Sequence, residues 1–141
     1  MFKKILVAYD GTDTSEVALR RAAELAGQGH AELHVLGVAR LVITAAAGVE
    51  ISQSLFDAER EMRESALRDA VAHLDERVSV HAAIREGNPP TQIAAHAREI
   101  GADLVVIGHS DKSLFARFFE GSTGAGLIRD LPCDLLVATG P

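Results

Sequence analysis

The stretch Leu104-Val105-Val106-Ile107 is a continuous apolar run that ends at a glycine, Gly108. Runs of this kind, without alternating polar residues, are typical of strands that are buried on both faces of a parallel sheet. A second run of the same kind, Ile-Leu-Val-Ala-Tyr, occupies residues 5–9. Together the two runs predict a parallel sheet with helices on both of its faces.

Outward from these two runs, strands and helices alternate along the whole sequence. Three more apolar strands are predicted, at residues 31–39, 78–85 and 135–138. Apolar stripes at helical spacing, helix-starting residues and helix-ending glycines predict four helices. The first helix follows the turn at 10–14 and ends at Gly27 and Gly29. The other three are expected at 52–77, 90–100 and 121–130, and residues 40–51 are expected to be a connecting loop. This alternation predicts one doubly wound α/β domain over residues 1–141 with five parallel strands.

Size and charge narrow the functional classes. A chain of 141 residues is the usual size of one domain. Its net charge of −6 argues against a surface built to coat nucleic acid. The first apolar run reaches only to Asp10, which is too short for a signal peptide or a membrane span. One cysteine, Cys133, permits no intrachain disulfide and fits a reducing compartment. We therefore expect a cytoplasmic protein that binds neither nucleic acid nor membranes.

Candidate binding residues follow the first and fourth predicted strands. Ligands of open parallel sheets bind beyond the C-terminal ends of the strands, where Asp10-Gly11-Thr12 and Gly108-His109-Ser110-Asp111 would lie. Gly121-Ser122-Thr123 opens the last expected helix, where free backbone N–H groups and the helix dipole favour an anion. By themselves these three residues can also be an ordinary helix cap.

The order of these motifs resembles the universal stress protein family. That family carries G-x2-G-x9-G-[ST] after its fourth strand, and Gly108 and Gly121-Ser122 match this spacing. Asp111 replaces the middle glycine. Further similarity is found at residues 5–12, 86–89, 102–108 and 131–137, so that it covers nearly the whole chain apart from the connection at 40–51.

The resemblance implies a sheet order of 3-2-1-4-5, as in adenine nucleotide alpha hydrolase-like folds. It also implies a stress-response regulatory protein that holds ATP or AMP between the loops after strands 1 and 4, with Mg²⁺ as a further candidate. Family members commonly form homodimers through the last strand, here residues 135–138. An exposed apolar edge strand favours such pairing on physical grounds as well.

Roles for single residues are likewise implied by the resemblance. Asp10, with Gly11 and Thr12, would face the ribose or the metal and phosphate side. Val38 would contact the adenine, and Gly108 and His109 would line the path of ribose and phosphates. The phosphates themselves would be held by Gly121, Ser122 and Thr123.

Asp111 leaves a second function open, namely a dimeric protein-interaction module with a degenerate nucleotide site. Its carboxylate would repel phosphates unless a divalent cation bridges them or the side chain turns outward. No group of nucleophile, base and orienting residue can be assembled from the sequence, so any catalysis would be at most slow ATP hydrolysis. The sequence also lacks a dinucleotide-binding G-x-G-x-x-G after the first strand.

The remaining reactive side chains have ordinary structural interpretations. Histidines at positions 30, 34, 73, 81 and 96 are scattered, and their spacing shows no zinc set. Asp10 can simply close the turn before the first helix. Cys133, which follows a proline, is interpreted as a small buried hydrophobic residue.

We predict that ATP with magnesium binds the wild-type protein weakly and that Asp111→Gly tightens this binding. The substitution removes a negative charge and restores a bare backbone N–H at the phosphate loop, and calorimetric titration measures the change. An affinity that is unchanged or lower in the variant would contradict the prediction. As a control, Gly121→Val should abolish binding because its side chain blocks the approach of the backbone to a phosphate.

Overall fold

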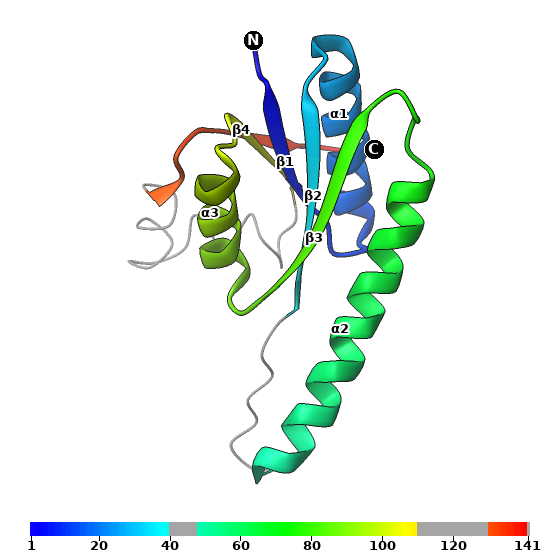
Figure 1. Cartoon of the computed structure of the whole chain (residues 1–141), viewed down its shortest axis with the longest axis vertical. Coiled ribbons are helices and arrows are strands. Elements are labelled where there is room, and N and C mark those ends of the chain that lie inside the picture. The colour runs from blue at the N-terminus through cyan, green and yellow to red at the C-terminus, as the bar shows by residue number, and fades with distance from the viewer. Residues whose placement is uncertain (40–47, 110–129, 141) are drawn as a thin grey trace.

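The computed structural model describes residues 1–39, 48–109 and 130–140, which form a parallel sheet with helices on both faces (Figure 1). Five strands are present, and their order is β3-β2-β1-β4-β5, as the resemblance implied. The strands are β1 (Lys4–Ala8), β2 (Glu32–Ala39), β3 (Ser79–Glu86), β4 (Leu104–Gly108) and β5 (Asp134–Ala138).

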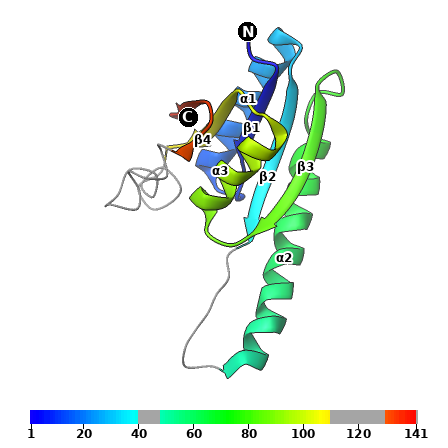
Figure 2. The same cartoon turned by 60° about the vertical axis from the view of Figure 1, so that its left-hand side comes forward.

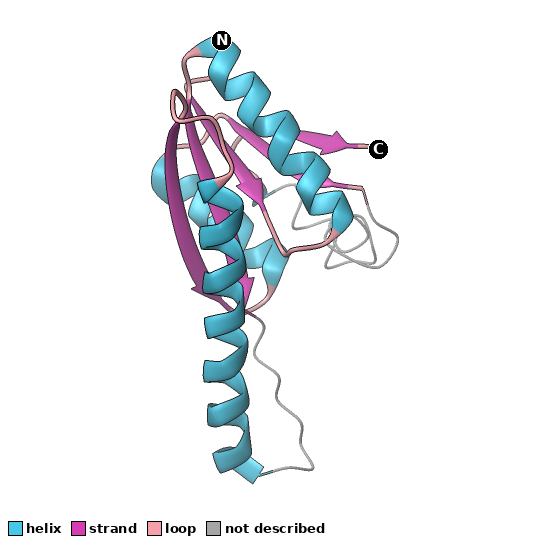
Figure 3. Cartoon of the chain, turned by 90° about the vertical axis from the view of Figure 1, so that its right-hand side faces the viewer, coloured by secondary structure: helices cyan, strands magenta, loops and turns pink. Residues whose placement is uncertain are grey.

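In the part of the chain that the structure describes, three helices cover the sheet. They are α1 (Asp13–Gly29), α2 (Gly48–Ala72) and α3 (Pro89–Ile100). Both α1 and α2 lie on one face, where α1 contacts β1 and β4 and α2 contacts β2 and β3 (Figure 3). On the opposite face, α3 packs against β1 and β2 (Figure 2). Within the described part of the chain, none of the helices has a stretch long and apolar enough to cross a membrane.

Two apolar cores result, one on each face of the sheet. Because successive side chains of a strand point to opposite faces, Ile5 and Val7 enter the core under α1 and α2, and Leu6 enters the core under α3. In β4, residues 104–107 are at most 2% exposed. The expectation of strands buried on both faces is therefore confirmed for both apolar runs.

The sequence prediction is confirmed at the end of the first helix and differs from the structure at both ends of the second. The first helix ends at Gly29, and its C-cap His30 takes a left-handed conformation with φ 53°. The second helix begins at Gly48 instead of residue 52. It ends at Ala72 instead of residue 77, where the backbone N–H groups of His73 and Leu74 donate to the carbonyl oxygens of Ala70 and Val71 in a tighter turn. Most of the helix expected at 121–130 lies outside the described residues.

The end of β4 is packed directly against the first turn of α1. A Cβ atom placed on Gly108 would lie 2.3 Å from the backbone oxygen of Thr14 and 2.6 Å from its carbonyl carbon. Since real Cβ atoms do not approach backbone atoms so closely, any side chain at position 108 would push α1 away from the sheet. Gly108 is therefore required by packing, whatever its role toward a ligand.

We predict that Gly108→Ala lowers the free energy of unfolding by about 1–3 kcal/mol, the usual cost of overpacking. Urea unfolding of both proteins measures the difference. Gly27→Ala is the matched control, since its Cβ would meet only Val78 at an ordinary distance of 3.7 Å. Alanine in a helix should raise stability there by about 0.5–1 kcal/mol. Equal stability of wild type and Gly108→Ala would show that α1 does not pack against β4 in this way.

Candidate functional site

A pocket opens at the C-terminal ends of β1 and β2, beneath the start of α3. Most of its wall is apolar, and the polar groups come from the β1–α1 turn and from α2. The pocket lies beside the point where the strand order reverses. That point is at β1, which has β2 as its neighbour on one side and β4 on the other. The residues that line it are Ala8, Tyr9, Asp10, Leu36, Val38, Arg63, Pro89 and Ile93.

The turn between β1 and α1 is held by its own hydrogen bonds. One carboxylate oxygen of Asp10 accepts from the backbone N–H of Thr12 at 3.0 Å and from the Thr12 hydroxyl at 2.6 Å. Thr12 is the N-cap of α1, and its hydroxyl oxygen accepts from the backbone N–H of Ser15 at 3.3 Å. Gly11 between them has φ +84°, which a residue with a side chain rarely adopts. The expected turn and cap are thus confirmed.

These bonds also set the charge of Asp10. Burial by itself raises the pKa of this carboxyl group. The hydrogen bonds with Thr12 and Ser15 and the charge of Arg63 together lower the pKa by more than burial raises it. The pKa therefore lies below its ordinary value of 3.8. Asp10 is an anion at neutral pH, with part of its hydrogen-bonding capacity used by the turn.

Arg63 brings a positive charge to the pocket from the middle of α2. Its guanidinium donates to the backbone carbonyl oxygen of Asp10 at 2.9 Å and lies 3.7 Å from the carboxylate of Glu59. The side chain is half-buried, at 26% exposure. The sequence analysis did not single out this residue, because α2 carries many alternating charges and the spacing alone does not show which one reaches the sheet.

Val38 lines the pocket and is 9% exposed. The start of α3 contributes Pro89, the first residue of the helix, which follows the helix cap Asn88. The Asn88 side chain accepts the backbone N–H of Thr91 at 3.3 Å, and this contact fixes the direction of α3. Val38 and Pro89 therefore belong to one apolar wall.

Other candidate residues lie apart from this pocket or outside the described chain. Gly108 is buried at the end of β4, and the backbone N–H of the exposed His109 donates to the carbonyl oxygen of Ala138 in β5 at 2.9 Å. Asp111, Gly121, Ser122 and Thr123 all lie outside the described residues.

Two further side chains have structural partners. Tyr9 turns its ring into the core under α1 and α2, where its hydroxyl donates to Glu16 at 2.5 Å. Burial, together with Glu16, raises the pKa of Tyr9 to about 12. Cys133 is half-buried against the core under α3, and burial raises the pKa of its thiol. This agrees with its interpretation as a small hydrophobic residue.

Comparison with known proteins gives a consistent result over nearly the whole chain. The family model described as "Universal stress protein family" matches residues 1–139. A universal stress protein of Methanocaldococcus jannaschii is 29% identical, and the alignment covers 100% of this chain and 84% of that protein.

Solved structures agree. A universal stress protein family member from Burkholderia pseudomallei is 32% identical with a TM-score of 0.73, and the match covers 96% of this chain and 94% of that one. A universal stress protein solved in complex with cAMP is 24% identical with a TM-score of 0.70, and the match covers 96% of both chains. At that identity the cAMP complex shows likeness of fold alone.

We predict that Asp10 makes stability depend on pH in the acid range. Because its pKa is lowered in the folded protein, its contribution is fully present above the pKa of the unfolded chain, about 3.9, and is lost as the pH falls through the folded value. Urea unfolding of wild type and Asp10→Asn at pH 6, 5, 4 and 3 tests this. The difference in unfolding free energy should be largest at pH 6 and should shrink below pH 4. A difference that is constant over this range would contradict the prediction.

Proposed function

The chain belongs to the universal stress protein family, and we propose that it is a stress-response regulatory protein that binds ATP or AMP. The nucleotide would enter the pocket at the ends of β1 and β2 and continue toward the loop after β4. The observation that carries the proposal is this pocket, which combines an apolar wall with an anion and a cation at its rim. That combination suits a flat base joined to a polar, charged remainder.

The adenine is assigned to the apolar part of the pocket. Val38 at the end of β2 and Ile93 and Pro89 of α3 provide surfaces that exclude water from the faces of a base. The universal stress protein solved with cAMP, an adenine nucleotide, supports the choice of ligand.

The ribose and phosphates are assigned to the rim and to the phosphate loop. Asp10 is ionised and half-buried there, and its second carboxylate oxygen could accept from a ribose hydroxyl or join a magnesium ion. Gly108 and His109 would line the path of the ribose and phosphates. As the sequence analysis expected, Gly121, Ser122 and Thr123 would then hold the phosphates.

We propose, in addition, that two copies pair through β5. This strand forms one edge of the sheet, and Leu135, Leu136 and Val137 are each partly exposed there. An edge strand with unpaired backbone groups and apolar side chains favours pairing with a second copy.

We expect calorimetric titration to show saturable binding of ATP or AMP by the wild-type protein, with cAMP as a third ligand to compare. Arg63→Ala should weaken binding about tenfold, equivalent to about 1.4 kcal/mol, because it removes a half-buried cation next to a polyanion. Arg68→Ala is the matched control: it removes the same charge from the same helix, but Arg68 is exposed and does not line the pocket.

Each outcome of this titration has a separate meaning. Binding that is weakened by Arg63→Ala and not by Arg68→Ala supports the pocket as the site. Equal loss in both variants would mean that charge alone matters and would contradict the assignment. No heat with any of the nucleotides, with or without magnesium, would overturn nucleotide binding and favour the protein-interaction module.

A further inference from the structure

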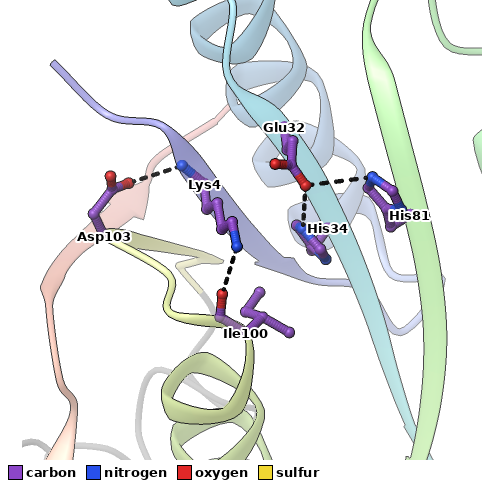
Figure 4. A network of polar contacts seen from close by, with 6 residues as sticks. All are labelled: Lys4, Glu32, His34, His81, Ile100 and Asp103. Atoms are coloured by element: carbon purple, nitrogen blue, oxygen red, sulfur yellow. Dashed lines mark hydrogen bonds and ion pairs between the residues drawn. The ribbon is translucent and has the colours of Figure 1, made fainter.

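Three potential metal ligands meet on the open part of the sheet, far from the nucleotide pocket. Glu32 and His34 are two positions apart on β2 and therefore share one face of the sheet, the face that α3 covers only in part. His81 lies beside His34 on the edge strand β3 (Figure 4). The strand register pairs His34 directly with His81. Among the residues that the structure describes, these three form the group whose ligand atoms all lie within 4.8 Å of one another.

The distances within this group match those of a zinc site. One carboxylate oxygen of Glu32 lies 3.3 Å from Nε2 of His34 and 3.4 Å from Nε2 of His81. Two ligand atoms bound to a tetrahedral Zn²⁺ at about 2.0–2.1 Å are separated by about 3.3–3.4 Å. The carboxylate and each imidazole are thus already spaced as two corners of such a tetrahedron.

The two imidazole rings are stacked, with centroids 4.7 Å apart and planes inclined by 17°. From neighbouring strands, the Nε2 atoms of both rings face the same carboxylate, that of Glu32. His34 is the fixed member, with 14% of its side chain exposed, whereas His81 is 53% exposed and has room to rotate toward a shared ion. The exposed side of His81 and Glu32 also gives a metal ion access from solvent.

The neighbouring cation is directed away from the group. Lys4 of β1 lies on the same face, but its ammonium donates to the carbonyl oxygen of Ile100 at the end of α3, at 3.1 Å (Figure 4). Its backbone N–H is bound to the carboxylate of Asp103 at 3.2 Å. Lys4 is therefore held by α3 and the following turn, and the carboxylate of Glu32 is directed to the two imidazoles.

We propose that Glu32, His34 and His81 bind one Zn²⁺ ion, with a water molecule as the fourth ligand. Two histidines and one carboxylate are a ligand set that zinc uses in proteins, and they leave one coordination position open. The ion would tie the edge strand β3 to β2. The sequence spacing showed no zinc set because the two histidines are distant in the chain and are brought together only by the register of the sheet.

This site is independent of the nucleotide pocket. Glu32 is the first residue of β2, and Val38 lies six positions further along the same strand. At about 3.3 Å per residue, the two are roughly 20 Å apart. Zinc binding can therefore be tested, and can fail, without any consequence for nucleotide binding.

The test is a calorimetric titration of the chelator-treated, desalted full chain with zinc chloride. We expect one Zn²⁺ per chain for the wild type, and an affinity at least tenfold lower for His81→Ala and for Glu32→Gln. His73→Ala is the matched control, because it removes an exposed histidine that lies in the turn after α2 and outside this group. Cys133→Ser controls for the thiol, and both controls should bind zinc as the wild type does.

A second measurement reports the ligands themselves. Co²⁺ in place of Zn²⁺ should give the intense visible absorption bands of a four-coordinate ion in the wild type and lose them in His81→Ala. Far-UV circular dichroism checks that this variant is folded, and His81→Gln serves as a second variant if it is not. The proposal is overturned if the wild type shows no saturable zinc binding, or if His73→Ala or Cys133→Ser weakens binding as much as His81→Ala does. Arg63→Ala should leave zinc affinity unchanged, which separates this result from that of the nucleotide titration.

Discussion

Burial of β1 and β4 on both faces is the constraint on which the rest of this structure depends. Neither strand has a polar face, so each needs an apolar layer above and below it. Helices α1 and α2 provide one layer, and α3 contributes to the other. Since parallel strands can be joined only by crossovers, each connection returns the chain to the same end of the sheet. The chain moves outward from β1 through β2 to β3 and then crosses once to β4, on the other side of β1. That one step makes the reversal of strand order beside β1, and with it sets the position of the pocket.

At this reversal of strand order, groups that hold the fold together are also those proposed to bind the nucleotide. The turn after β1 uses one oxygen of Asp10 to fix Thr12, and Thr12 in turn caps α1. Gly108 at the end of β4 is needed for the approach of α1 as well as being a candidate ligand contact. Under the proposed assignment, a substitution at either position would change both the stability of the fold and the affinity for nucleotide. Val38 and Arg63 are better probes of binding, because they line the pocket without capping a helix.

The sequence predicted the strands well because their apolar runs report burial directly. The runs at 5–9 and 104–107 locate the two central strands to within one residue, whereas the order 3-2-1-4-5 came from the family resemblance and not from any pattern of residues. Contacts between distant elements could not be predicted. Arg63 reaches Asp10 through the packing of α2, and His34 meets His81 through the strand register. The end of α2 was misplaced because the apolar residues keep a helical spacing past Ala72, although the backbone there changes to a tighter turn.

The length of α2 gives the contact between Arg63 and Asp10 a mechanical consequence. The N-terminal half of this helix extends well past the end of the sheet, as Figure 1 shows, and the exposed side chain of Leu55 lies on that half. From Arg63 to Gly48 the helix spans roughly 22 Å, at about 1.5 Å per residue. A tilt of only about 5° at Arg63 would move the far end by about 2 Å. A small tilt of the helix about Arg63, beside the pocket, would therefore become a displacement of several tenths of a turn's rise at the far end of the helix.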